Sequence, residues 1–405
     1  MTCGQSPAGE RWKALNYRAS RPIQGGPAPK TPRGLGDNRR VTSPNTSSEL
    51  NPRIHQAIAQ AGGWIGFDRF MAMALYEPEL GYYTNALQKF GAMPSSGSDF
   101  VTAPGLTPMF GHTLAVQVKQ ALQATDTHEV WEFGAGTGAL ALQLLDSLGD
   151  AVTRYTIIDL SGTLRARQAE TLAAHAHKVR WLDAWPEAIE GVVVGNEVLD
   201  AMPVQLLQRT GGVWHERGVV SAGEAFAWED RLTDLRPPMA IEGEHDYLTE
   251  IHPQGEAFIA SLAERLQAGR GGAAFFLDYG FPEGEYFHPQ RHMGTVMCHQ
   301  LHQADADPLV AVGQKDITAH VNFTGVALAA QNAGLHVLGY TSQAWFLLNL
   351  GLAERMAEAS LAERSQAQRL VNEHEMGELF KVVGLSTSDA WAAQGFERGD
   401  RSHRL

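Results

Sequence analysis

Three glycines at alternate positions follow an acidic residue between residues 130 and 145. Glu132 comes first, and Gly134, Gly136 and Gly138 follow it. Glycines allow left-handed backbone conformations and leave no Cβ between the chain and a ligand. The apolar residues after them recur at helical spacing, so the N–H groups of a new helix would face that ligand. Because a carboxylate in an apolar strand is costly without a partner, Glu132 indicates a ligand that carries hydrogen-bond donors.

Two cofactors are compatible with this turn. Residues 134–139 fit the dinucleotide pattern G-x-G-x-x-A, which has an acid about twenty residues further on. Residues 132–138 also fit the E-x-G-x-G-x-G turn that binds S-adenosylmethionine (SAM) in methyltransferases. Glu132 and Gly138 favour SAM, because its methionine part carries an ammonium group that needs acceptors and a diphosphate does not. A purely structural glycine turn is the alternative.

Two further acids end predicted strands. Asp159 follows a strand at 154–158, and Asp183 follows a strand at 179–182. Asp159 could accept hydrogen bonds from both ribose hydroxyls, and Asp183 from the adenine amine beside the Ala184 backbone. Capping of the segment that follows is the alternative for both. The full predicted cofactor-binding set is Glu132, Gly134, Gly136, Gly138, Asp159, Leu160, Asp183, Ala184, Asn196 and Thr102.

The stretch 196–203 ends another predicted strand and holds the catalytic candidates Glu197 and Asp200. Two carboxylates three residues apart could orient a substrate amine or guanidinium bidentately. Methyl transfer depends mostly on positioning, and a general base is needed only if the nucleophile starts protonated. In the alternative interpretation Asp200 caps a helix, and Glu197 is a core acid paired with a distant arginine.

Several histidines and acids gather within residues 288–307, but we expect no metal site there. The spacing places their side chains on different faces, and neither a cysteine pair nor an H-E-x-x-H helix accompanies them. Substrate contact or a place in a loop is the expected role of the histidines. The residues concerned are His288, His292, His299, His302, Asp305 and Asp307.

The elements that position these residues alternate between strand and helix. Apolar strands that alternate with helices predict an α/β fold with a parallel sheet covered on both faces. Its ligands would bind at the carboxyl ends of the strands. Predicted strands lie at 130–133, 154–158, 179–182, 191–195, 272–277, 294–299, 335–341 and 379–385, and an inserted antiparallel region holds strands at 204–209, 212–220 and 226–230. Predicted helices lie at 54–61, 67–75, 108–121, 139–145, 163–175, 323–333, 344–351 and 352–374, and residues 95–104 form a loop.

Composition limits the class of protein. The 405 residues are 44% hydrophobic and carry a net charge of −13, which argues against general nucleic-acid binding and is compatible with a cationic partner. The two cysteines, Cys3 and Cys298, are too few for a disulfide framework, which indicates a reducing compartment. We expect the bacterial cytoplasm rather than the mitochondrial matrix. No run is long enough to span a membrane, and no secretory segment opens the chain.

The first 48 residues differ from the rest. They hold eight Lys or Arg against Glu10 and Asp37, together with many Pro and Gly, so we expect a disordered basic tail. A mitochondrial targeting helix is disfavoured by the prolines at 22, 27, 29 and 32. The predicted organisation is this tail at 1–48, an N-terminal helical region at 49–122 and a SAM-binding Rossmann-like domain at 123–405. That domain has an insertion at about 204–250 and a helical addition at about 344–376.

Several stretches in one order resemble the MidA-type class I methyltransferases, the bacterial relatives of a mitochondrial protein that assists complex I assembly. They cover roughly residues 52–385, and the stretches at 196–204 and 316–323 are the most specific. The others are Gly-Tyr-Tyr at 81–83, Ser-Asp-Phe-Val-Thr-Ala-Pro at 98–104, the glycine turn, Asp-Tyr-Gly at 278–280, Gly-Thr at 294–295, Cys-His at 298–299, and Gln343 with Phe-Leu at 346–347.

The resemblance implies a Rossmann-like SAM fold with an N-terminal helical part and a substrate-covering insertion. It also implies symmetric dimethylation of a protein arginine in the mitochondrial branch. One departure concerns the loop after Ala103-Pro104, where the family usually has an acid and this chain has Gly105. We therefore expect a SAM-dependent methyltransferase with an arginine-bearing protein as acceptor. The alternatives are a small-molecule methyltransferase, a non-catalytic SAM-bound assembly factor and a nicotinamide dehydrogenase.

Overall fold

The computed structural model describes residues 46–85, 102–159, 161–301 and 303–405. These described residues form one compact unit. Most of the predicted basic tail, Leu160 and His302 lie outside the described residues. The division of the compact unit at residue 122, with its insertion and helical addition, stays a prediction.

An eight-stranded sheet forms the centre of the unit, in the order β15-β16-β10-β5-β2-β3-β4, with β14 (Val321–Asn322) beside β10. Five neighbouring strands run parallel, as predicted. Their apolar residues are buried on both faces, so the sequence shows near-continuous hydrophobic runs. These strands are β2 (Glu129–Phe133), β3 (Arg154–Ile158), β4 (Val179–Leu182), β5 (Gly191–Asn196) and β10 (Gly272–Phe281).

The last strand departs from the predicted parallel sheet. The last strand, β16 (Phe380–Ser386), runs antiparallel to β10 on one side. On its other side it runs antiparallel to β15 (His336–Ser342). A strand buried on both faces has the same apolar pattern in either direction, so periodicity could not show this reversal.

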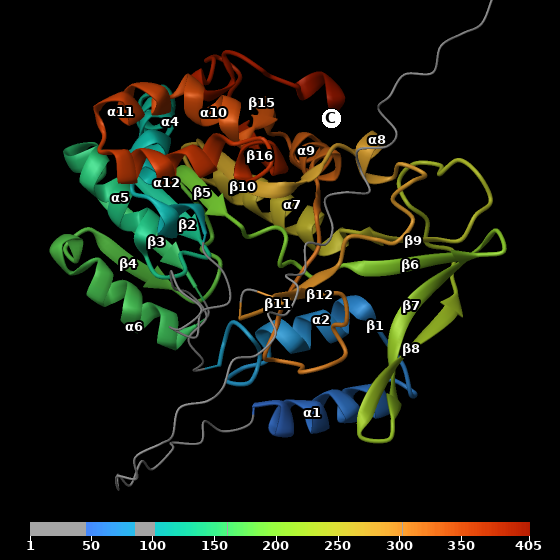
Figure 1. Cartoon of the computed structure of the whole chain (residues 1–405). Helices are drawn as coiled ribbons and strands as arrows, with labels where there is room; N and C mark the ends of the chain where they lie inside the picture. The colour runs from blue at the N-terminus through green and yellow to red at the C-terminus, as the bar shows by residue number, and fades with distance from the viewer. Residues whose placement is uncertain (1–45, 86–101, 160, 302) are drawn as a thin grey trace, which may run out of the picture. The chain divides into compact units, whose positions relative to one another are not determined.

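Helices cover both faces of the sheet (Figure 1). On one face α4 (Met109–Thr125) and α5 (Ala139–Leu148) share a core with Val130, and on the other α7 (Pro253–Ala268) and α9 (Phe323–Asn332) share a core with Trp131. The alternation of neighbouring residues between two cores follows from the two-residue period of a strand. The helix α6 (Gly162–Thr171) follows β3. In the part of the chain that the structure describes, no helix is long and apolar enough to span a membrane.

The helical stretch predicted at 352–374 is divided into two helices. The chain forms α11 (Leu352–Glu358) and α12 (Leu361–Val371), and Ser360 separates them. The Ser360 side chain accepts from the Glu363 N–H, and the Glu363 side chain accepts from the Ser360 N–H. This capping box starts a new helix and therefore ends the old one. Two short helices flank the pair, α10 (Gln343–Asn349) and α13 (Met376–Leu379).

A second sheet joins the N-terminal part to the predicted insertion (Figure 1). Its strands are β1 (Ile65–Gly66), β6 (Gln205–Thr210), β7 (Val213–Ala222), β8 (Ala225–Leu232) and β9 (Tyr247–Ile251). The pairing of β6, β7 and β8 confirms the three antiparallel strands predicted between residues 204 and 230, and β9 adds a strand that was not predicted. The helices α1 (Thr46–Gln60) and α2 (Phe67–Tyr76) pack in the same apolar core as this sheet.

Three smaller features bear on the site. A three-stranded sheet consists of β11 (Met297–Gln300), β12 (Gln303–Asp305) and β13 (Asp316–Thr318). The strand predicted at 294–299 therefore begins later, because Gly294 has a φ of 71° that does not belong to a strand. The loop predicted at 95–104 ends in a short helix, α3 (Ala103–Leu106), and residues 95–101 lie outside the described residues.

Candidate functional site

A cavity of about 1030 Å³ lies at the carboxyl ends of the parallel strands. The end residues of three neighbouring strands, Phe133, Ile158 and Asn196, line it. The strand order places β5 beside β2 and β2 beside β3, so the segments that follow these strands meet at one edge. This is the edge at which open α/β sheets bind ligands.

The glycine turn forms one wall of this cavity. Gly134, Gly136 and Gly138 have φ values of 64°, 51° and 82°, a left-handed backbone that favours glycine. Gly134 and Gly136 line the cavity, whereas Gly138 closes the turn by donating its N–H to the Ala135 carbonyl at 2.8 Å. Two of the three glycines therefore give a ligand access to bare backbone, and the third starts α5.

Glu132 is a buried acid at the cavity wall. The residue is 2% exposed, and the Tyr155 hydroxyl donates to its Oε2 at 2.7 Å. Burial raises the pKa of Glu132 to about 8, although the bond from Tyr155 opposes the shift. A cation at this wall would stabilise the carboxylate and be bound by it.

The other predicted cofactor residues that the structure describes also line the cavity. Asp159 accepts from the Ser161 N–H at Oδ1 and from the Gln168 amide at Oδ2, both at 2.8 Å. Burial raises its pKa. Ser161, not Asp159, caps α6, so Asp159 holds the turn and still faces the cavity. Asp183 and Ala184 are exposed at its edge, and Thr102 is half-buried.

The segment after β5 places Glu197 and Asp200 in the cavity. Glu197 has a φ of 55°, and its carboxylate accepts from the Asn196 amide at 2.9 Å. Burial raises the pKa of Glu197 to about 8, and the neighbouring Asp200 adds to the shift. Burial also raises the pKa of Asp200 to about 6. The two acids therefore lie close enough to repel each other when both are charged.

Two polar atoms of this segment lack a partner. Asp200 Oδ1 and Asn196 Oδ1 are buried without a hydrogen bond from any described residue. No lysine or arginine of the described chain forms an ion pair with Glu197 or Asp200, so no described residue supports the alternative of a core acid paired with a distant arginine. No helix starts at Asp200, so the capping alternative is wrong too. Buried acceptors without donors indicate a ligand that supplies them.

Asp278 was not predicted as a site residue, yet it shapes this segment. Its Oδ2 accepts from the N–H groups of Val198 at 3.0 Å, Leu199 at 2.8 Å and Asp200 at 3.3 Å. Burial raises the pKa of Asp278 well above its usual range, and Asp200 adds to the shift. Its signal in the sequence is an acid near the end of an apolar strand, the pattern that identified Asp159 and Asp183.

Residues from outside the five parallel strands line a further part of the cavity. They include Tyr76 from the end of α2, Asp316 and Thr318 from β13, and Phe380 from β16. His320 contributes a buried Nδ1 that has no partner in the described chain, and burial lowers its pKa to about 4.

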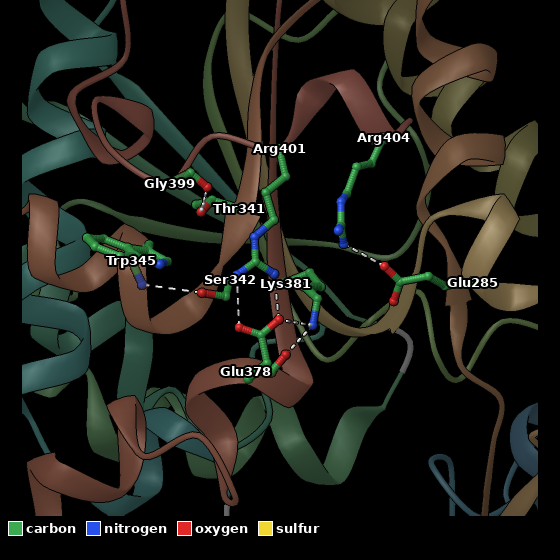
Figure 2. A network of polar contacts seen from close by, with 9 residues as sticks. All are labelled: Glu285, Thr341, Ser342, Trp345, Glu378, Lys381, Gly399, Arg401 and Arg404. Carbon is green, nitrogen blue, oxygen red and sulfur yellow. Dashed lines mark hydrogen bonds and ion pairs between the residues drawn. The ribbon is translucent and has the colours of Figure 1, made fainter. Parts of the chain in front are cut away.

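Next to Phe380, Glu378 binds both Lys381 and Arg401 (Figure 2). This network ties the C-terminal end of the chain to the cavity wall.

The predicted histidine group is dispersed. His299 lines the cavity, whereas His292 packs its ring against His245 and His288 accepts from the Gln290 N–H. Within the described residues, no three His, Cys, Asp or Glu side chains gather as metal ligands.

The cavity residues fit SAM by their chemistry. The turn without side chains leaves room for the ligand, Glu132 can accept from its ammonium group, and the acids near Asp200 suit a positive sulfonium. When bound, SAM supplies an electrophilic methyl group. Methyl transfer from SAM needs no pocket for a second nucleotide, whereas a nicotinamide dehydrogenase needs one.

Comparisons with known proteins agree with this fit. Residues 113–341 match the family model of S-adenosyl-L-methionine-dependent methyltransferases. A crystal structure from Burkholderia thailandensis, bound to S-adenosyl-homocysteine, is 48% identical over 90% of this chain and 99% of its own, with a TM-score of 0.85. Similar curated proteins include the protein arginine methyltransferase NDUFAF7 of Danio rerio, 27% identical over 84% of this chain and 88% of its own. The homologue in Drosophila melanogaster is 27% identical over 80% and 82%.

The family model spans more than half of the chain, and the chain covers nearly all of the related crystal structure. The chain therefore belongs to the MidA-type family of SAM-dependent methyltransferases and uses SAM as its cofactor.

Proposed function

We propose that the chain transfers the methyl group of SAM to an arginine side chain of a partner protein. The observation that carries this proposal is the buried Asp200 Oδ1, which has no donor among the described residues and faces a cavity of acids. A guanidinium offers five N–H donors and one positive charge. It would therefore satisfy both the missing hydrogen bond and the missing charge.

The proposed roles follow from the geometry of the segment after β5. Glu197 is fixed by the Asn196 amide and by its own left-handed backbone, so it can orient the guanidinium without rearranging. A C–N bond forms as the S–C bond breaks, and one N–H proton leaves the guanidinium. Asp200, with its pKa raised to about 6, can take that proton near neutral pH.

In the cofactor half, we propose that Glu132 and the glycine turn bind the methionine part. Asp159 would accept from the ribose hydroxyls, and Asp183 with Ala184 would contact the adenine. Asn196 and Thr102 would border the methyl group. Apart from Gly138, which closes the turn, each of these residues lines the cavity, and that position supports the assignments.

The names of the curated relatives support a protein acceptor, since they are called protein arginine methyltransferases. Gly105, where the family usually has an acid, lines the cavity and is exposed. We propose that its missing acid alters the contact with the acceptor. The low cysteine content supports a cytoplasmic location, whereas the names of these relatives describe them as mitochondrial. The location therefore stays a prediction.

The test is acceptor identification in cell extract. The full chain is incubated with methyl-labelled SAM and extract of the source cells, and labelled material is analysed by mass spectrometry. We expect methylarginine in a protein. Asp200→Asn should abolish the label, whereas Glu358→Gln, a change of an exposed residue on α11, should leave it unchanged.

Three outcomes would overturn the proposal. Label in a small molecule would favour a metabolite methyltransferase. Label in a protein at another residue type would reject arginine. If no label appears while a partner still co-purifies with the SAM-bound chain, the protein is a non-catalytic assembly factor.

A further inference from the structure

We propose that Asp316 is a specificity residue of the acceptor site, held in place by Tyr83, and that it binds the acceptor guanidinium together with Asp200. This inference rests on the proposed function and adds a residue that neither the glycine turn nor the segment after β5 supplies. It predicts selection of arginine over lysine.

Asp316 is buried in the same cavity as the catalytic candidates. The residue is 3% exposed and lines the cavity. Its charge contributes to the raised pKa of Glu197, so the two carboxylates act on one space. The Ala319 N–H donates to the Asp200 carbonyl at 2.9 Å and ties the segment after β13 to Asp200.

Tyr83 fixes the position of this carboxylate. The Tyr83 hydroxyl donates to Asp316 Oδ1 at 2.8 Å. This bond orients the Asp316 carboxylate at the cavity wall. A second, independent observation also indicates a ligand with donors in this part of the cavity: the buried Asp200 Oδ1 has no donor among the described residues.

Aromatic rings complete the acceptor part of the cavity. The rings of Tyr76 and Tyr83 stack with their centroids 5.6 Å apart and an interplanar angle of 20°. The Tyr76 hydroxyl donates to the Ala201 carbonyl at 2.9 Å, so each ring is fixed at its polar tip. A guanidinium is planar, stacks on aromatic rings and binds carboxylates in its plane, whereas an ammonium has no such plane. The combination of rings and acids therefore favours arginine.

The proposed acceptor residues can be separated from the cofactor residues. Asp316, Tyr76 and Tyr83 come from β13 and from α2 and the turn after it. The cofactor candidates come mainly from the ends of the parallel strands. A change at Asp316 should therefore lower acceptor affinity and leave cofactor affinity intact.

The experiment is calorimetric titration of the full chain saturated with S-adenosyl-homocysteine. The probes are the amides of Nα-acetyl-arginine, Nα-acetyl-lysine and Nα-acetyl-citrulline. We expect wild type to bind the arginine probe best and Asp316→Asn to bind it at least tenfold more weakly, with S-adenosyl-homocysteine affinity within twofold of wild type. Asp234→Asn, the same change at an exposed acid outside the cavity lining, is the matched control and should match wild type.

Tyr83→Phe guards against misfolding of the first variant, because it keeps the ring and removes only the hydroxyl. We expect it to reduce the preference for arginine over lysine about threefold, a ratio that a merely structural role would not change. Unchanged arginine affinity in Asp316→Asn, or no binding of any cationic probe to wild type, would overturn the inference. Wild-type preference for the lysine probe, lost in Asp316→Asn, would reject the arginine acceptor and keep Asp316 as a cation-binding residue.

Discussion

Replacing Glu132 by glutamine should remove a pH dependence of stability from the cofactor-free chain. Burial raises the pKa of Glu132 from 4.5 to about 8, so the folded chain binds the proton more tightly than the unfolded chain. The contribution of Glu132 to the free energy of unfolding is fully present below pH 4.5 and is lost as the pH rises through about 8. With about 1.4 kcal/mol per pKa unit, wild type should lose about 2 kcal/mol between pH 6 and pH 8 through this group alone.

Urea unfolding near pH 6 and near pH 8 measures the effect. We compare the pH-dependent change in the free energy of unfolding of Glu132→Gln with that of wild type, so that shifts at the other acids cancel. The difference should be about 2 kcal/mol, with the variant losing less stability. Glu358→Gln, at an exposed position, should behave as wild type. Equal losses in Glu132→Gln and wild type would refute the reasoning.

The same variant tests the contact with the ammonium group. If S-adenosyl-homocysteine places its ammonium at Glu132, binding should ionise this acid and release about three-quarters of a proton near pH 7.5. Calorimetry in buffers with different ionisation enthalpies counts the protons. Glu132→Gln should lose this release, and an unchanged proton count would contradict the assignment.

Three further changes have defined outcomes. Gly136→Val should weaken S-adenosyl-homocysteine binding at least about a hundredfold in calorimetry, because φ is 51° and the residue lines the cavity, and wild-type affinity would reject the role of the turn. Asp159→Ala should weaken binding by roughly 1–3 kcal/mol, the range for losing a charged acceptor, and an unchanged dissociation constant would count against the ribose contact. Arg401→Met removes both bonds to Glu378, at 2.5 and 3.1 Å (Figure 2), and should cost about 1 kcal/mol in urea unfolding, because the pair is partly exposed. A loss above about 3 kcal/mol would contradict this estimate of a partly exposed pair.

The strand ends could be predicted because their signals are local. An apolar run followed by an acid marks Asp159 and Asp183, and alternate glycines after Glu132 mark the turn. The break before α12 was also readable, since Ser360 and Glu363 have capping-box spacing. The charged residues around this signal continue a helical pattern, so periodicity alone predicts an unbroken helix.

The acceptor part of the cavity depends on contacts between distant residues. Tyr83 and Asp316 are 233 positions apart, and no local pattern pairs them. Asp278 has a local signal, because it is an acid near the end of an apolar strand. Its hydrogen bond from the Asp200 N–H could not be predicted without knowing that β10 lies beside β5 in the sheet. The direction of β16 likewise depends on its neighbours rather than on its residues.

A crystal structure of the full chain with S-adenosyl-homocysteine would test the central claim most directly. We predict the amino group of the ligand at Glu132, its ribose at Asp159 and its sulfur facing the segment with Glu197 and Asp200. A ligand bound elsewhere, or one whose sulfur faces away from Asp200, would contradict the account.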